Sequence, residues 1–483
     1  LRNAPIGFYM ADYPPLGRAW LGLSHKLACA LSPPEDHTSP IVIAAARTGS
    51  AVAFGLLVIV VGYVSGKWYG PVAGMTAATS LVLMPRLFGH AHLASLETVM
   101  SLVYVAVVFS VAGYWSKQPP PIRKTALLTG LVFGLALLTK VQAILLPVPI
   151  TLWAFFHWKQ RAVLPLALWG LAGLGVFFLL WPWLWLDPIQ HFSEYFLRTT
   201  ERVTINVWYF GSKLADKDVP WHYPAVMFLT TVPVGLHLLG CAGLFMSSPS
   251  QVNSEFDGKE MPTVPKPWQD SRLQLVFVCF LFPLLLFSLP GVVVYDGARL
   301  FLVVFPLWAV FIGRGSAAVI AWLSQRWSRK ISVSAFAVFL LLQAYGIVSF
   351  APCYLSYYNL SVGGLRGAER LGLEPTYWGD SITRDFLEKV CDEVPEGSTI
   401  DVMPVLQPTY LDILLDQSPL LRNHKIHLRP YHPEKNGPPH YVMIFRRKAD
   451  LPFPLREDPA NATVLTEVQI QGVRLAALYE FRE

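Results

Sequence analysis

Uncharged apolar runs constrain the fold of this chain more than any other feature. Ten such blocks, separated by short stretches that hold most of the charged residues, fill the first 352 residues: 48–66, 68–85, 98–116, 125–139, 141–158, 162–186, 221–245, 273–290, 300–313 and 331–352. Most approach the roughly 20 residues that a membrane-spanning helix needs, although 125–139 and 300–313 are short. With 53% apolar and only 14% charged residues, a soluble globular chain is excluded. The sequence predicts an all-α polytopic membrane protein with about ten spans.

Two flanking segments depart from this pattern. Residues 1–41 contain two Pro pairs and, over 17–32, charged residues among Leu, Trp and Ala, which predicts an amphipathic helix lying on the membrane. After residue 352 the alternating runs 398–403, 440–445 and 473–481 predict strands, and 381–390 predicts a helix. We therefore divide the chain into a loop segment (1–41), a transmembrane domain (42–352) and a small soluble α/β domain (353–483).

The Lys and Arg residues of the connecting loops indicate an orientation. One set of alternate loops holds most of them: Lys67, Lys117, Arg123, Lys124, Lys159, Arg161, the mixed segment 247–272, Arg314, Arg326, Arg329 and Lys330. The other set is not free of cations, so the asymmetry is a bias, and by the positive-inside rule the first set is cytoplasmic. The first forty residues, the turn 86–97, the loop 183–220 and the segment after residue 352 are then expected outside.

The turn 86–97 places ionisable groups at one membrane boundary. Arg86, His90, His92 and Glu97 lie here between two uncharged runs. Such groups are costly at a membrane unless they face a cavity or a partner, which suggests a reaction centre. The alternatives are an ordinary interfacial turn and, for Glu97, a first-turn acid that faces the helix dipole beside a capping Ser95.

Two further cations and an acid are expected at the same level. Lys140 and Arg299 interrupt apolar sequence, and Asp296 precedes Arg299 by three positions. Clustered cations suit a phosphate or diphosphate group, a carboxylate suits activation of a hydroxyl, and aromatic residues of the outer loops suit sugar rings. Snorkelling of Lys140 and Arg299 to water, and an interfacial aromatic belt, are the structural alternatives.

The five cysteines show no zinc-ligand spacing and no disulfide framework. A pair between Cys353 and Cys391 is left open, because it depends on an oxidising compartment.

Several motifs resemble a known enzyme superfamily. Tyr13-Pro-Pro-Leu-Gly-Arg18 resembles the first-outer-loop motif of protein O-mannosyltransferases, and the following segments resemble bacterial members of the same superfamily: 88–97, 138–140, 181–188, 221–224, 295–299 and 363–378. These are GT-C membrane glycosyltransferases of the mannosyltransferase-like and aminoarabinose-transferase-like type, similar to glycosyltransferase family 39. The resemblance implies a polyprenyl-phosphate sugar donor, an inverting transfer and an active site on the outer face.

Residue chemistry and resemblance together assign roles. Glu97 and Asp12 are expected to be catalytic; Lys140, Arg299 and Arg86 to bind the donor phosphate; and His90, His92, Tyr13, Trp221, His222 and Asp296 to line the acceptor or sugar cleft. No metal ligand is assigned, and a divalent metal ion as cofactor is left open.

One departure from the family pattern concerns the catalytic base. These families place an acidic residue in the first outer loop, before the Pro-Pro motif, whereas here only Asp12 lies there, next to the motif itself. We expect that the first span and the start of this loop are missing from the sequence. An inactive chain is one outcome that this departure allows.

The leading interpretation is a glycosyltransferase of the bacterial inner membrane whose active site and C-terminal domain are periplasmic. Its expected partners are membrane lipid, a polyprenyl-phosphate sugar and a lipid, glycan or protein acceptor, and nucleic acid is not expected. A transporter or flippase, or a polymerase of lipid-linked glycans, is the alternative. A transporter is expected to show internal repeats or broken helices with polar residues near mid-membrane.

Overall fold

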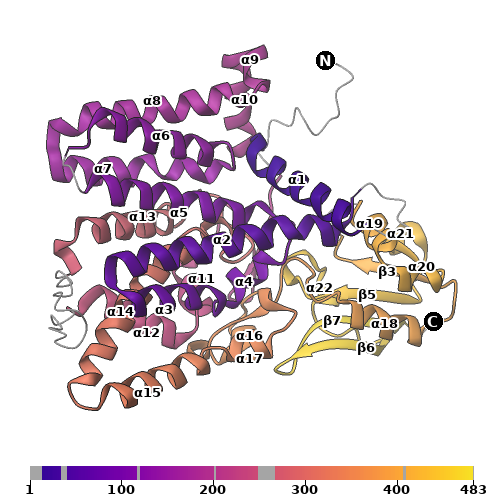
Figure 1. Ribbon diagram of the computed structural model, residues 1–483. Coiled ribbons are helices and arrows are strands. Elements are labelled where there is room, and N and C mark those ends of the chain that lie inside the picture. The colour runs from indigo at the N-terminus through magenta and orange to yellow at the C-terminus, as the bar shows by residue number, and fades with distance from the viewer. Residues whose placement is uncertain are drawn as a thin grey trace.

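The computed structural model describes residues 13–33, 41–116, 120–200, 203–247, 267–405 and 409–481. Helices make up nearly all of the regular structure before residue 370, and a five-stranded sheet lies beyond one end of the helical part (Figure 1). The predicted fold class, a helical membrane protein with a small α/β domain, is confirmed.

The helical part coincides closely with the predicted blocks. Its helices are α1 (Pro15–Leu31), α2 (Ile43–Tyr69), α3 (Pro71–Val82), α4 (Pro85–Ala91), α5 (Leu96–Trp115), α6 (Arg123–Leu137), α7 (Pro147–Trp158), α8 (Val163–Leu179), α9 (Trp183–Leu186), α10 (Pro188–Thr200), α11 (Tyr223–Thr231), α12 (Val234–Phe245), α13 (Ser271–Phe287), α14 (Val304–Ser324), α15 (Arg329–Leu342), α16 (Tyr345–Ser349) and α17 (Gly364–Arg370). Each predicted block overlaps one to three of these helices. The helix predicted over 17–32 is present as α1.

Not every block is one straight helix. In the described part of the chain, five helical stretches are long and apolar enough to cross a membrane: Ile43–Tyr69, Leu96–Trp115, Val141–Leu179, Val304–Ser324 and Arg329–Ser349. Two bent pairs, α3 with α4 at 70° and α11 with α12 at 109°, raise the count to as many as seven. Pro85 and Pro233 stand at these bends, where proline interrupts helical hydrogen bonding. The ten-span count stays a prediction.

The sequence predicted Arg314 in a loop, and this prediction is wrong. Helix α14 continues through it to Ser324, and the residue is 1% exposed. Its Nη1 donates hydrogen bonds to the carbonyl oxygens of Gly243 at 2.5 Å and Met246 at 2.9 Å, at the end of α12. These carbonyls have no helical partner of their own, so they take the place of water around the cation.

The C-terminal part is a mixed sheet with the strand order β4-β3-β5-β7-β6. The strands are β3 (Thr399–Met403), β4 (His427–Pro430), β5 (Tyr441–Phe445), β6 (Ala462–Ile470) and β7 (Val473–Phe481), and the helices are α18 (Arg384–Glu393), α19 (Thr409–Gln417), α20 (Pro419–Asn423), α21 (Pro433–Asn436) and α22 (Phe453–Arg456). Strand β3 pairs in parallel with β4 and β5, while β7 pairs antiparallel with β5 and β6. The three predicted strands and the predicted helix are present as β3, β5, β7 and α18. Cys353 and Cys391 are buried free thiols.

The segments predicted to share one face do meet at one end of the helical part. The loop 203–220 contains a hairpin of β1 (Asn206–Tyr209) and β2 (Ser212–Ala215), from which Asn206 Nδ2 donates to Asp450 Oδ1 at 3.1 Å. The ring of His90 bonds to the Tyr377 hydroxyl at 3.0 Å. The sheet therefore lies against the outer loops, while the side of the membrane that they face stays a prediction.

Candidate functional site

The turn between α4 and α5 holds a buried carboxylate. Helix α4 buries Arg86 and His90, and α5 has Glu97 in its first turn. Ser95 occupies the N-cap position without a side-chain capping bond. Glu97 is only 4% exposed, and a buried carboxylate needs a counter-charge, which a helix dipole alone does not supply.

Two cations provide this counter-charge. Lys140 Nζ lies 2.8 Å and Arg299 Nε 2.7 Å from the same atom, Oε1 of Glu97. Lys140 follows α6, whereas Arg299 begins the short helix η5 (Arg299–Phe301). The side chain of Lys140 is 9% exposed, so it does not snorkel to water. Glu97 therefore gathers two cations from remote parts of the chain at one point.

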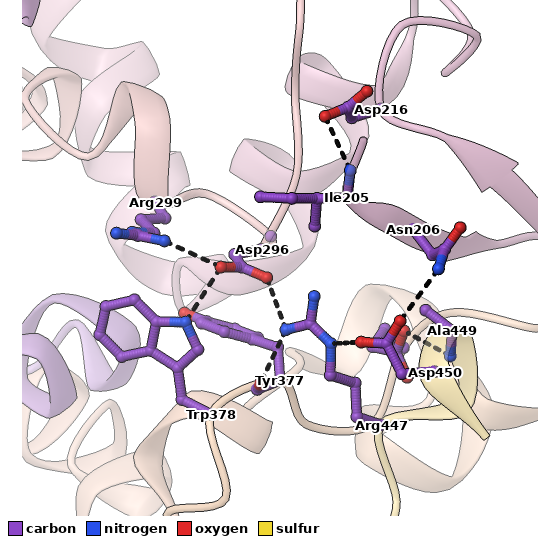
Figure 2. Close-up of polar contacts among 12 residues, drawn as sticks. Ile205, Asn206, Asp216, Asp296, Arg299, Tyr377, Trp378, Arg447, Ala449 and Asp450 are labelled. Atoms are coloured by element: carbon purple, nitrogen blue, oxygen red, sulfur yellow. Dashed lines mark hydrogen bonds and ion pairs between the residues drawn. The ribbon is translucent and has the colours of Figure 1, made fainter. Parts of the chain in front are cut away.

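Asp296 connects Arg299 to the C-terminal domain, as Figure 2 shows. Its Oδ2 accepts hydrogen bonds from Arg299 Nη1 and Trp378 Nε1, both at 3.0 Å, and its Oδ1 accepts one from Arg447 Nη1 at 2.8 Å. The backbone at Asp296 is left-handed, with φ of 56°, a conformation that non-glycine residues rarely adopt. Three side-chain hydrogen bonds hold the carboxylate in this arrangement.

Together these side chains form a row of alternating charge. Arg447 Nε donates to Asp450 Oδ2 at 2.5 Å, which completes the sequence of six. The charged row, as we call it, consists of Lys140, Glu97, Arg299, Asp296, Arg447 and Asp450. Burial lowers the pKa of Arg299 and of Arg447, but the neighbouring carboxylates outweigh it and raise both pKa values. Both guanidinium groups are therefore charged at any physiological pH.

Arg86 and His90 lie beside the charged row. Arg86 Nε donates to the carbonyl oxygen of Tyr357 at 3.1 Å, and its guanidinium lies 4.4 Å from the ring centre of Tyr358. His90 bonds to Tyr377 through Nε2, while its buried Nδ1 has no hydrogen-bond partner among the described residues. Among the described hydrogen bonds and ion pairs, none joins either side chain to Glu97 or Asp296. The Arg86 guanidinium lies instead over the rings of Tyr358 and Tyr377.

Other predicted site residues are not brought to the charged row. His92 is exposed and packs its ring against Phe88, with centroids 4.5 Å apart. His222 bonds through Nδ1 to the Tyr209 hydroxyl at 2.7 Å, and its neighbour Trp221 is 69% exposed. Tyr13 is half-buried just before α1, and Asp12 falls outside the described residues.

The sequence did not single out Arg447, Asp450 or Trp378 as site residues. Trp378 lies in one of the segments that carry the resemblance, but nothing there marked its indole as a partner of Asp296. Arg447 belongs to an Arg-Arg-Lys run that directly follows β5. Cations at the carboxyl end of a buried strand were the available signal.

No group of three or more His, Cys, Asp or Glu residues in the described chain could hold a metal ion. The carboxylates of the charged row all have cationic partners already, so they do not fit a divalent metal. The sequence left a divalent metal ion as cofactor open, and it stays untested.

A buried acid next to Arg447 predicts a pH dependence. Burial raises the pKa of Glu374 to about 8, despite hydrogen bonds from the backbone N–H groups of Lys448 at 2.5 Å and Ala449 at 3.3 Å. The folded chain keeps this proton at pH values where the unfolded chain has lost it. Stability should therefore fall as pH rises from about 4.5 to about 8. Thermal melts across this window should show a shallower decline for Glu374→Gln; an unchanged slope would contradict the assignment.

Comparison with known proteins leaves the family of this chain open. No family model matches it, and no curated protein does. Among solved structures, the chain is similar to a crystal structure of ArnT from Cupriavidus metallidurans in the apo state, with a TM-score of 0.48 and 14% identity over 97% of this chain and 87% of that one. A structure of the same protein bound to undecaprenyl phosphate gives a TM-score of 0.47 and 14% identity, over 97% and 88%.

Proposed function

We propose that this integral membrane protein is a glycosyltransferase that takes a sugar from a polyprenyl-phosphate donor. The observation that carries the proposal is the pair of cations, Lys140 and Arg299, held on one oxygen of Glu97 at the end of the helical part. In line with the loop charges, we place this end on the periplasmic side of a bacterial inner membrane.

The geometry suits a phosphate group. Arg299 uses Nε for Glu97 and Nη1 for Asp296, so its Nη2 is not engaged in either bond. The Arg299 side chain is 21% exposed, compared with 3% for Glu97 and 9% for Lys140. Arg299 is therefore the most accessible of these three residues. A phosphate that approaches Arg299 meets a fixed guanidinium and an ammonium already held together.

An apolar groove beside Lys140 suits the polyprenyl chain. Leu137 and Val141, on either side of Lys140 in the sequence, line a groove of 330 Å³ together with residues of α6, α7, α8 and α10. Trp169, Phe177 and Phe196 form part of its wall. A lipid phosphate can thus place its chain in the groove and its head group near the two cations.

The transfer itself breaks the bond between sugar C1 and the phosphate oxygen, whose electron pair leaves with polyprenyl phosphate. The acceptor oxygen bonds to C1 from the opposite side, with inversion, and its proton passes to a general base. Glu97 and Asp296 both accept hydrogen bonds from cations, so their carboxylate oxygens are already engaged. We therefore assign Glu97 to positioning of the cations and keep Asp12 as the predicted base.

The test is transfer from a labelled donor. Membranes that contain the full chain should release undecaprenyl phosphate from a radiolabelled undecaprenyl-phosphate sugar, and membranes with Arg299→Ala should not. Binding of undecaprenyl phosphate is measured in parallel. Absence of both release and binding would overturn the proposal.

A broken helix, one feature expected of a transporter, is present between α11 and α12, but its backbone carbonyls are already hydrogen-bonded. The α11–α12 break leaves backbone carbonyls without helical partners. Asn359 fills it: Nδ2 donates to the carbonyl oxygens of Leu229 at 2.7 Å and Val232 at 2.6 Å. At 1% exposure of Asn359, this break does not present its carbonyls to a passing ion.

Asn359→Ala should therefore destabilise the protein. An unsatisfied buried polar group costs about 1–3 kcal/mol, and two carbonyls lose their donor here. The midpoint of thermal unfolding in detergent should fall clearly for Asn359→Ala. Asn436→Ala, at an exposed asparagine that also bonds a backbone carbonyl, is the control and should leave it unchanged. Equal midpoints for both variants would show that the break is satisfied in another way.

A further inference from the structure

A cavity of 790 Å³ lies between the helical part and the C-terminal sheet. Residues 203–206 and the loop that contains Asp296 and Arg299 line one side. The other side is formed where the parallel strands β3 and β4 end, with Tyr410 at the start of α19. This volume is within the roughly 300–1,000 Å³ of ordinary ligand pockets.

The cavity is continuous with the proposed transfer site. Asp296 and Arg299 belong both to its lining and to the charged row, while Tyr431 and His432 mark the part formed by the C-terminal domain. A molecule that fills the cavity therefore reaches the cations assigned to the donor phosphate. That position suits the second substrate of a transfer better than a remote effector.

The charges that line the cavity balance one another (Figure 2). Among the described lining residues the Lys, Arg, Asp and Glu members are Asp296, Arg299, Arg447 and Asp450, two of each sign. Each is paired within the set, through contacts of 3.0, 2.8 and 2.5 Å. The wall thus presents hydrogen-bonding groups and, among these four side chains, no net charge.

Aromatic residues complete the wall. Tyr410, Tyr431, Trp378 and Phe445 line the cavity, and the indole N–H of Trp378 is fixed by its bond to Asp296. Aromatic rings offer broad, rigid contact surfaces at small entropic cost, and paired polar groups offer directional hydrogen bonds. A sugar ring has apolar C–H faces and an edge of hydroxyl groups. Aromatic faces next to ion-paired polar side chains match both parts of such a ring.

We propose that this cavity binds the acceptor and that the acceptor is a carbohydrate with uncharged sugar rings. The proposal rests on the glycosyltransferase function and narrows its substrate class from lipid, glycan or protein to glycan. The C-terminal domain selects the acceptor through Tyr431 and His432, while Lys140 and Arg299 bind the donor.

The experiment measures saccharide binding to the purified full chain by saturation-transfer NMR. The probes are neutral oligomers of glucose, mannose and N-acetylglucosamine, with oligogalacturonate as the acidic probe and an uncharged peptide as the third class. We expect at least one neutral oligomer to bind and His432→Ala and Tyr431→Phe each to weaken it several-fold. His427→Ala is the matched control, because His427 is exposed at the opposite end of β4 and outside the lining. Preference for the acidic probe or the peptide, or no saccharide binding, would overturn the proposal.

A second arm separates this result from the proposed function. Lys140→Ala should weaken binding of undecaprenyl phosphate but leave saccharide binding unchanged, and His432→Ala should do the reverse. If the unmodified chain bound a saccharide but not undecaprenyl phosphate, the donor assignment alone would be contradicted. Intact lipid-phosphate binding without saccharide binding would contradict the acceptor assignment alone.

Discussion

Replacing Glu97 by Gln should lower turnover by about 10²-fold and destabilise the protein. The change keeps the size of the side chain but removes the charge that holds Lys140 and Arg299 on one oxygen. Displacing either cation by about 1 Å is enough to cost about 10²-fold in rate. Removing one partner of a buried ion pair typically costs about 3–5 kcal/mol. A purely catalytic acid would instead change the rate and leave the stability unchanged.

A ligand measurement distinguishes positioning from a merely structural role. Phosphate can replace the lost negative charge, so undecaprenyl phosphate should raise the thermal midpoint of Glu97→Gln by more than that of the unmodified chain. Turnover is measured as release of undecaprenyl phosphate from the labelled donor. Normal turnover together with equal ligand stabilisation in both proteins would remove Glu97 from the donor site.

Replacing Lys140 or Arg299 by Ala should weaken donor binding by roughly tenfold to a hundredfold. A charge-assisted hydrogen bond is worth about 1.5–3 kcal/mol, which corresponds to this range of affinity. Either variant leaves Glu97 with one cation, so it should fold. Titration with undecaprenyl phosphate in detergent measures the effect.

The control for these two variants is Lys425→Ala. Lys425 also pairs with a carboxylate, that of Glu396, but its side chain is 72% exposed, and such surface pairs contribute little. The affinity of Lys425→Ala for undecaprenyl phosphate should equal that of the unmodified chain. If Lys140→Ala and Arg299→Ala matched this control, the two cations would serve only to neutralise Glu97.

The site residues that could be predicted are charged residues that interrupt apolar sequence. Glu97, Lys140 and Arg299 stand out because the residues around them suit a membrane, and ionisable groups there need partners. The structure brings these three into direct contact. Asp296 could be placed with them because it precedes Arg299 by only three positions.

Side-chain direction limited the remaining predictions. His92 and His90 are two residues apart, and the structure buries one and exposes the other because α4 ends between them. The pair of Asp296 with Arg447 joins positions 151 apart, and Arg447 lies in polar sequence where a cation is unremarkable. The end of one predicted span was also wrong. Arg314 was expected just after it, but α14 continues through Arg314, which donates a hydrogen bond to a backbone carbonyl inside the protein.

The strand order has a consequence for biosynthesis. Strand β7 follows every other described element in the chain, yet it lies between β5 and β6 in the sheet. Its Leu475 carbonyl accepts a hydrogen bond from the backbone N–H of Arg446 at 2.8 Å, directly before Arg447. The ribosome therefore makes all the apolar helices before the strand that fixes Arg447 exists. Insertion into the membrane can therefore precede assembly of the charged row. In a nascent chain that stops before residue 473, Arg447 would be present, but β7 would not yet hold it beside Asp296.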